Sequence, residues 1–252
     1  MEQNQYWQQR KNGGQKVTPK ISELPFQAKE AINVLRGNIQ LSGYDLKTVA
    51  VTSAVSHEGK SSIAFRLAKS MASLHKKTLY LDCDIRNSTT LSRYEIEQKV
   101  EGLTEFLCGN IPLLDAIYKT DDPYMDIVFT GAVAPNPSEL ISGPLFEKMI
   151  TYVRGNYDYV IVDTPPVNPV IDGTLIARHC DGTVMVIESG LTERDQAVKA
   201  KKQLEYAGVK VLGAVLNKVG AEKGGYGYGG YGYGYGYGYG QENSNSTHRK
   251  KR

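Results

Sequence analysis

One stretch of the sequence has the residue types and spacing of a phosphate-binding loop. It reads AVSHEGKSS over residues 54–62, between a β-branched run and an amphipathic run. It matches the pattern Gly-x-x-x-x-Gly-Lys-Ser, except that alanine replaces the first glycine. In such loops the backbone N–H groups and the lysine bind phosphate oxygens, and the serine hydroxyl binds Mg²⁺. We therefore expect a nucleotide to contact the following residues: Ala54, Ser56, His57, Glu58, Gly59, Lys60, Ser61 and Ser62.

Three aspartates follow two other β-branched runs. Asp82 and Asp84 stand two residues apart in LYLDCDIR, and Asp163 ends the apolar part of YDYVIVDTPP. A spacing of two places both carboxylates on the same side of an extended segment, with Cys83 on the other side. Carboxylates beside phosphates can hold Mg²⁺ or accept a proton. These aspartates therefore complete a predicted site for magnesium and a nucleotide.

The elements that must position these residues alternate between strand and helix. Amphipathic stretches separate short β-branched runs, which predicts a mostly parallel sheet with helices on both faces, the α/β fold of phosphate-loop NTPases. Ligands bind such folds at the carboxyl ends of the strands, where the motifs lie. The expected strands span residues 48–54, 78–84, 125–131, 157–165, 182–189 and 209–219.

Length and composition indicate one domain with two irregular ends. We assign residues 1–25 to a flexible N-terminal segment, 26–219 to the catalytic domain, and 220–252 to a disordered tail rich in Gly and Tyr with a basic C-terminus. The apolar runs are shorter than the roughly 18 residues of a membrane span. The polar N-terminus does not resemble a signal peptide, and three cysteines suit a reducing compartment. We expect a cytoplasmic protein.

The charge is concentrated at the ends of the chain. The formal net charge is +3, and the last twelve residues carry all of it, because they hold four basic residues and one glutamate. The first twenty residues are also basic, so the middle of the chain is slightly acidic. This distribution does not predict a nucleic-acid-binding face. The basic ends suit either contact with anionic lipid or simple solvation.

The C-terminal segment GGYGYGGYGYGYGYGYGQE alternates glycine with tyrosine. Glycine at every other position disfavours helix and packed strand, so any tyrosine can be presented to an enzyme. From Val219 to Tyr233 a flexible chain spans about 20 Å, which favours entry into a neighbouring molecule's site. A structural or phase-separating role is an alternative. The seven tyrosines are Tyr226, Tyr228, Tyr231, Tyr233, Tyr235, Tyr237 and Tyr239.

The phosphate loop, LYLDCDIR, YDYVIVDTPPV, GAVAPNPSEL and the tyrosine cluster together resemble the bacterial tyrosine kinases of capsule and exopolysaccharide synthesis, of the cytoplasmic type. The resemblance covers residues 26–239. It implies an ATP- and Mg²⁺-dependent protein-tyrosine kinase that autophosphorylates its tail and regulates polymer synthesis and export, and the short reach of the tail favours transfer in trans. Arg86 is expected to assist Lys60 and Mg²⁺ in stabilising the charge on the transferring phosphoryl group. The resemblance assigns catalytic roles to Lys60, Asp82 and Asp84, with Asp82 as the base. It assigns metal binding to Ser61, Asp84 and Asp163.

The resemblance also implies partners. These are a separate membrane-spanning activator that recruits the protein to the inner face of the membrane, a cognate tyrosine phosphatase, and further copies of the chain in a ring, with an octamer as one size. The family carries a Glu-x-x-Arg-x-x-Arg pattern for self-association on an N-terminal helix. Here the matching residues are Glu30, Asn33 and Arg36, so the first arginine is missing. Loss of one exposed ion pair weakens such an interface by about 1 kcal/mol or less.

The main alternative is a partitioning or cell-division ATPase of the same fold. Those proteins carry a second lysine near the start of the phosphate loop, and Val55 occupies that place here. The tyrosine cluster has no role in that interpretation, except as a structural or interaction segment. Both features favour the kinase.

Overall fold

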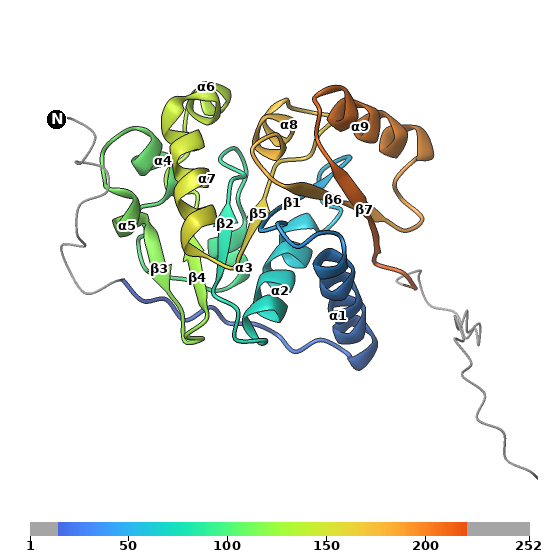
Figure 1. Cartoon of the computed structure of the whole chain (residues 1–252), viewed down its shortest axis with the longest axis horizontal. Helices are drawn as coiled ribbons and strands as arrows, with labels where there is room; N and C mark the ends of the chain where they lie inside the picture. The colour runs from blue at the N-terminus through green and yellow to red at the C-terminus, as the bar shows by residue number, and fades with distance from the viewer. Residues whose placement is uncertain (1–14, 221–252) are drawn as a thin grey trace, which may run out of the picture. The chain divides into compact units, whose positions relative to one another are not determined.

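The computed structural model describes residues 15–220 and contains one seven-stranded sheet (Figure 1). The strand order is β3-β4-β2-β5-β1-β6-β7, and every pairing is parallel except that of β3 with β4. The strands are β1 Thr48–Ser53, β2 Thr78–Asp82, β3 Ile117–Lys119, β4 Met125–Val128, β5 Tyr159–Asp163, β6 Gly182–Glu188 and β7 Val211–Asn217.

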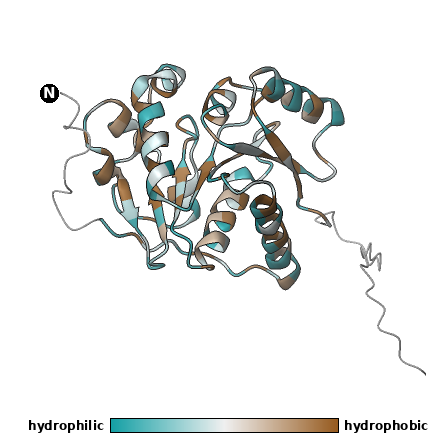
Figure 2. Cartoon of the chain, viewed as in Figure 1, coloured by the Kyte–Doolittle hydropathy of each residue, from teal (hydrophilic) through white to brown (hydrophobic). Residues whose placement is uncertain are grey.

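Helices cover both faces of the sheet and enclose its apolar side chains. One face packs against α1, α2 and α3, and the other against α4 to α9. In Figure 2 the strands are mostly brown, whereas α9 is teal along most of its length. The helices are α1 Phe26–Leu41, α2 Lys60–Ala72, α3 Thr90–Arg93, α4 Leu103–Leu107, α5 Leu113–Ala116, α6 Pro137–Ser142, α7 Pro144–Asn156, α8 Asp172–Ala177 and α9 Arg194–Tyr206.

The predicted fold class is confirmed: the sheet is mostly parallel and flanked by helices on both faces. A strand forms within each of the six predicted ranges. Strand β3 was not predicted, because three residues are too few to establish a two-residue period. It is the outermost strand of the sheet and runs antiparallel to β4. It therefore does not change how the carboxyl ends of the parallel strands, which carry the motifs, are arranged.

The strand order explains why the motifs meet. Strands β2, β5 and β1 are neighbours, with Asp82 paired to Asp163 and Val51 also paired to Asp163. Their carboxyl ends therefore lie side by side although they are far apart in the chain. In doubly wound sheets this edge is where ligands bind.

The folded unit begins before residue 26, where we had placed its boundary. The backbone N–H of Val17 donates to the Lys119 carbonyl at 2.8 Å, and Lys119 donates to Gln15 at 2.8 Å. Val17 is buried among apolar side chains. Residues 15–25 thus contribute to the body rather than to the predicted flexible segment. The predicted tail lies outside the described residues, apart from Gly220.

Within residues 15–220, the structure contains no helix with the length and apolar character needed to cross a bilayer.

Candidate active site

The phosphate loop connects the end of β1 to the start of α2. Gly59 immediately precedes α2 with φ of 90°, in the left-handed region that favours glycine. A Cβ added at this position would lie 2.2 Å from Nδ2 of Asn217, so a larger residue would displace the Asn217 side chain. The first backbone N–H groups of α2 are consequently presented at the carboxyl edge of the sheet, where a helix N-terminus attracts phosphate.

A cavity of about 1120 Å³ opens beside this loop. Its wall includes the loop residues Ser56, His57, Gly59, Lys60, Ser61 and Ser62, together with side chains from α1 and from the end of β7. The volume exceeds the 300–1,000 Å³ usual for small-molecule sites. It can therefore contain a nucleotide with space left for a second group.

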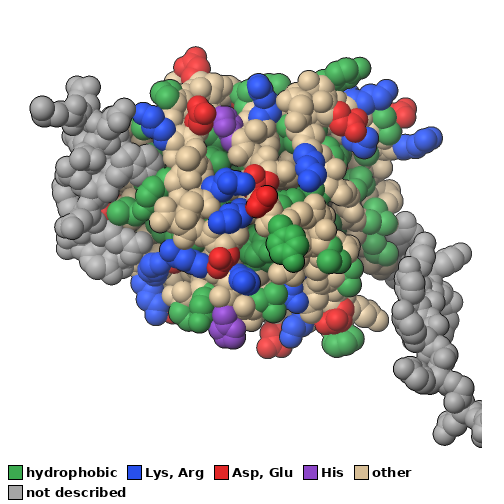
Figure 3. Space-filling model, viewed as in Figure 1, with side chains coloured by type: hydrophobic (Ala, Val, Ile, Leu, Met, Phe, Trp, Pro, Cys, Tyr) green, Lys and Arg blue, Asp and Glu red, His purple; other side chains and the backbone are tan. Residues whose placement is uncertain are grey.

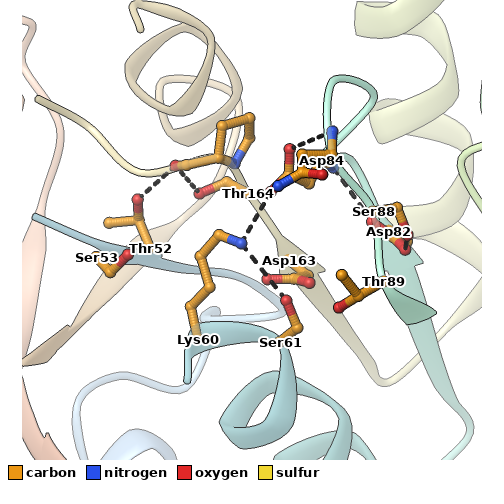
Figure 4. Close-up of polar contacts among 12 residues, drawn as sticks. Thr52, Ser53, Lys60, Ser61, Asp82, Asp84, Ser88, Thr89, Asp163 and Thr164 are labelled. Atoms are coloured by element: carbon orange, nitrogen blue, oxygen red, sulfur yellow. Dashed lines mark hydrogen bonds and ion pairs between the residues drawn. The ribbon is translucent and has the colours of Figure 1, made fainter. Parts of the chain in front are cut away.

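Lys60 faces the aspartates predicted to share its site (Figure 4). Its Nζ lies 2.8 Å from Oδ2 of Asp84 and 3.5 Å from the Ser61 hydroxyl. Burial alone lowers the pKa of Lys60, but the charges of Asp163, Asp84 and Asp82 outweigh it and raise the pKa overall. The lysine therefore stays protonated while buried, as a ligand for phosphate oxygens requires.

Asp82 lies deeper than Asp84. It is completely buried, and its carboxylate accepts hydrogen bonds from the Ser88 hydroxyl and from the backbone N–H of Asp84. Burial raises its pKa, which the hydrogen bonds partly offset. Asp84 lines the cavity, whereas Asp82 is not part of its wall. Ser88 therefore stands next to the carboxylate predicted to act as the base.

Asp163 is the buried carboxylate between Lys60 and Asp82. The Tyr80 hydroxyl donates to its Oδ2 at 3.1 Å. Burial raises its pKa to about 7, with Lys60 opposing and Asp82 adding to this shift. Its Oδ1 is buried and has no hydrogen-bond partner of good geometry within the described residues, although the nearby Ser61 hydroxyl lowers the pKa of Asp163. An orphaned carboxylate oxygen is costly unless a ligand satisfies it.

The donor set fits Mg²⁺ bound together with phosphates. Ser61, Asp84 and Asp163 offer only oxygen, which Mg²⁺ prefers. Among residues 15–220, no three His, Cys, Asp or Glu side chains form a metal cage of their own. The orphaned Oδ1 of Asp163 supplies an acceptor that the protein leaves unused.

Comparison with known proteins decides between the two families considered above. The AAA domain family matches residues 46–190. The tyrosine-protein kinase CpsD of Streptococcus agalactiae is 42% identical over 199 residues, covering 79% of this chain and 87% of the relative. The chain belongs to the bacterial tyrosine-protein kinases.

Solved structures agree with this assignment. The kinase domain of the Escherichia coli tyrosine kinase ETK superposes with a TM-score of 0.74 at 27% identity, covering 86% of this chain and 95% of that domain. The septum site-determining protein MinD from Pyrococcus horikoshii, complexed with Mg-ADP, gives 0.61 at 21% identity, covering 71% of this chain and 72% of that one. MinD thus shares the fold alone.

Glu58 of the kinase has a different environment from the rest of its loop. Its side chain is completely buried and faces the segment after β6, away from the cavity wall. Its neighbours on both sides line the cavity. Of the loop residues predicted to contact a nucleotide, Ala54 is also buried outside the wall, as the residue that continues β1.

Sequence reasoning did not identify several residues at the cavity. Asn217 and Lys218, at the end of β7, donate side-chain hydrogen bonds at 2.9 Å to the carbonyls of Glu58 and His57. Both stand at the carboxyl end of a strand that we predicted to be parallel, so their position in the sequence could have identified them as candidates for the site. Arg93, which donates to the Ser62 hydroxyl at 2.9 Å, carried none.

Arg86 reaches the cavity wall and is held there by α8 and α6. Its guanidinium pairs with the buried Asp172 and donates to the Ser138 hydroxyl at 3.2 Å. The pair raises the pKa of Arg86, so its charge is permanent. Asp172 and Ser138 are therefore partners that fix the expected assisting arginine.

The three residues matched to the self-association pattern form a network inside the chain. Asn33 donates to Glu30 at 2.9 Å and accepts from the Ser70 hydroxyl at 3.2 Å, while Arg36 donates to the Ser70 carbonyl and hydroxyl. These bonds join α1 to α2. A role in assembly remains a prediction, and the seven tail tyrosines lie outside the described residues.

Proposed function

We propose that this tyrosine kinase transfers the γ-phosphoryl group of ATP to the tyrosines of its own C-terminal cluster, in trans, and thereby regulates capsule or exopolysaccharide synthesis and export. The observation that carries the proposal is the meeting of Lys60 with three aspartates at the edge of a nucleotide-sized cavity. Membership of the tyrosine-protein kinases supplies the acceptor class. The tyrosine-rich tail supplies an acceptor within the chain itself.

The nucleotide is proposed to place its phosphates against the start of α2. Lys60 would exchange its bond to Asp84 for one to a phosphate oxygen, which leaves Asp84 free to support the metal with Ser61 and Asp163. Mg²⁺ held there would supply positive charge beside the transferring group, and such electrostatic stabilisation is the main source of catalysis in this reaction class. Arg86 reaches the same cavity with a fixed positive charge.

Asp82 is proposed as the base. The tyrosine oxygen forms a bond to the γ-phosphorus, the bond from that phosphorus to the oxygen bridging to ADP breaks, and the phenolic proton passes to a carboxylate. The raised pKa of Asp82 suits a proton acceptor. Because the Ser88 hydroxyl covers this carboxylate, the acceptor must either displace Ser88 or pass its proton through that hydroxyl.

Transfer between copies is proposed because the tail is short. A flexible chain from Val219 to Tyr233 would span about 20 Å, and a ring of copies would supply each site with a neighbour's tail at high effective concentration. We further propose that a membrane-spanning activator recruits the cytoplasmic kinase to the membrane, and that a cognate tyrosine phosphatase reverses the reaction. The resemblance to the cytoplasmic kinases of capsule synthesis supports both partners.

The proposal is tested by incubating the purified full chain with ATP and Mg²⁺ and mapping phosphotyrosine by mass spectrometry, with and without the cytoplasmic segment of the proposed membrane-spanning activator. Label on residues 226–239 is expected. ATP hydrolysis without label on the tail, even with that segment present, would favour a plain ATPase. Chelation of Mg²⁺ provides the control and should abolish labelling.

A further inference from the structure

A second layer of polar contacts lies behind the phosphate loop and does not touch the cavity. Its centre is the carboxylate of Glu58, which is completely buried. Oε2 accepts the backbone N–H of Val55 at 2.7 Å. Oε1 accepts the Thr192 hydroxyl and, at 3.4 Å, the backbone N–H of Glu188. One loop side chain therefore joins the start of its own loop to the segment between β6 and α9.

The arrangement is suited to holding a loop in one shape. A buried carboxylate is stable only when its oxygens accept hydrogen bonds, and removal of one partner leaves a costly unpaired charge. The Thr192 hydroxyl also accepts the N–H of Glu188 at 3.1 Å, so its own proton is directed to Glu58. Without that hydroxyl, Oε1 of Glu58 would keep only the long hydrogen bond from the backbone N–H of Glu188.

The same loop is held a second time from β7. Asn217 binds the Glu58 carbonyl, and Lys218 binds the His57 carbonyl while forming an ion pair with Glu188 at 2.7 Å. The C=O and N–H of a trans peptide point in opposite directions. Fixing these two carbonyls therefore fixes the direction of the N–H groups of Glu58 and Gly59. Those N–H groups belong to the loop expected to surround phosphates.

We propose that Glu58 is a positioning residue for the nucleotide and that Thr192 holds it in place. Neither side chain lines the cavity, so both act through the backbone of the phosphate loop. The link also makes the segment from Glu188 to Thr192 a structural support of nucleotide binding. This inference rests on the proposed binding of MgATP at the loop.

The test compares two substitutions at Thr192 in the full chain. Thr192→Val keeps the shape and removes the hydroxyl, whereas Thr192→Ser keeps the hydroxyl. We measure the dissociation constant of Mg-ADP by calorimetry and the unfolding midpoint without nucleotide. Thr192→Val should weaken binding about tenfold in a folded protein, which corresponds to about 1.4 kcal/mol, and Thr192→Ser should stay within about twofold of the wild type.

Glu58→Gln keeps the test decisive if Thr192→Val does not fold. It retains the size of the side chain and one acceptor oxygen, and should bind Mg-ADP more weakly than the wild type while remaining folded. Wild-type affinity in either folded variant, or equal losses for Val and Ser at Thr192, would overturn the inference. Absence of Mg-ADP binding in the wild type would instead count against the proposed function.

Discussion

Lys60 and Asp84 form a largely buried ion pair, with Nζ 2.8 Å from Oδ2. The pair joins the start of α2 to the end of β2, and Asp163 and Asp82 stand close enough to raise the lysine's pKa further. One positive charge therefore faces three carboxylates. This excess of negative charge is suited to a site completed by Mg²⁺ and by a nucleotide whose phosphates take over the lysine.

Replacing Lys60 tests the loop and the ion pair together. Lys60→Met should abolish phosphorylation of the tail, and circular dichroism should show the fold retained because the loop's backbone is held by other contacts. Breaking this largely buried pair leaves Asp84 unpaired, so the free energy of unfolding should fall by about 3 kcal/mol, the lower end of the range for a fully buried pair. The double variant Lys60→Met/Asp84→Asn should recover part of that loss. No recovery would show that the pair does not carry the effect.

Comparison of the two aspartates after β2 separates proton transfer from binding. Asp82→Asn should lower turnover by about 10² or more and change MgATP affinity only modestly, as loss of a positioned base does. Asp84→Asn should weaken MgATP binding, because Asp84 lines the cavity beside Lys60. Turnover and calorimetric affinity are measured for both variants. Parallel loss of both quantities in Asp82→Asn would identify Asp82 as a metal ligand.

The titration of Asp163 predicts an unusual effect on stability. Its pKa of about 7 in the folded chain lies above the value of about 3.9 expected when unfolded. The folded state therefore binds the extra proton between these values, and stability falls as pH rises through that window. Asp163→Asn without nucleotide should be more stable than the wild type at pH 8, by at least about 1 kcal/mol.

Denaturant unfolding at pH 8 and pH 5 measures this difference. The gain from Asp163→Asn should shrink at pH 5, where the wild-type carboxyl is already protonated in the folded chain. The same variant should lose kinase activity. A wild type more stable than the variant at pH 8 would mean that the ionised carboxylate does not destabilise the folded protein in the absence of nucleotide.

Much of the fold and site followed from local signals. The six runs of β-branched residues, the phosphate loop and the spacing of Asp82 and Asp84 all depend on residues close in the chain. Their meeting at one edge followed from a general property of parallel sheets. Near the centre of the face drawn in Figure 3, Lys and Arg side chains lie next to Asp and Glu side chains.

Other features required the tertiary structure. Glu58 resembles any polar loop residue in the sequence, and only its packing against Thr192 distinguishes it. Arg36 matched a self-association pattern, yet its guanidinium bonds to Ser70 within the same chain. Residues 15–25 show no clear helical or strand periodicity of apolar residues, so the sequence did not predict that Val17 packs against the core. Long-range partners of this kind have no fixed spacing along the chain.

Phosphorylation of the tail should weaken self-association. Each phosphotyrosine adds about −1.5 to −2 charges at pH 7, so seven add roughly −10 to −14. A tail of that charge is repelled by other tails and by a site that holds three aspartates. Light scattering should show a shift from oligomer to monomer on autophosphorylation, reversed by a tyrosine phosphatase and reduced at high salt. Equal masses for the two forms at matched concentration would exclude the switch.

The most direct measurement of the central claim is transfer between two defective copies. One copy carries Lys60→Met with an intact tail, and the other has an intact site with its seven tail tyrosines changed to Phe. Phosphotyrosine mapping of the mixture with ATP and Mg²⁺ should place label on residues 226–239 of the Lys60→Met copy. Absence of label, in a mixture shown to contain mixed oligomers, would contradict transfer in trans at the site built around Lys60.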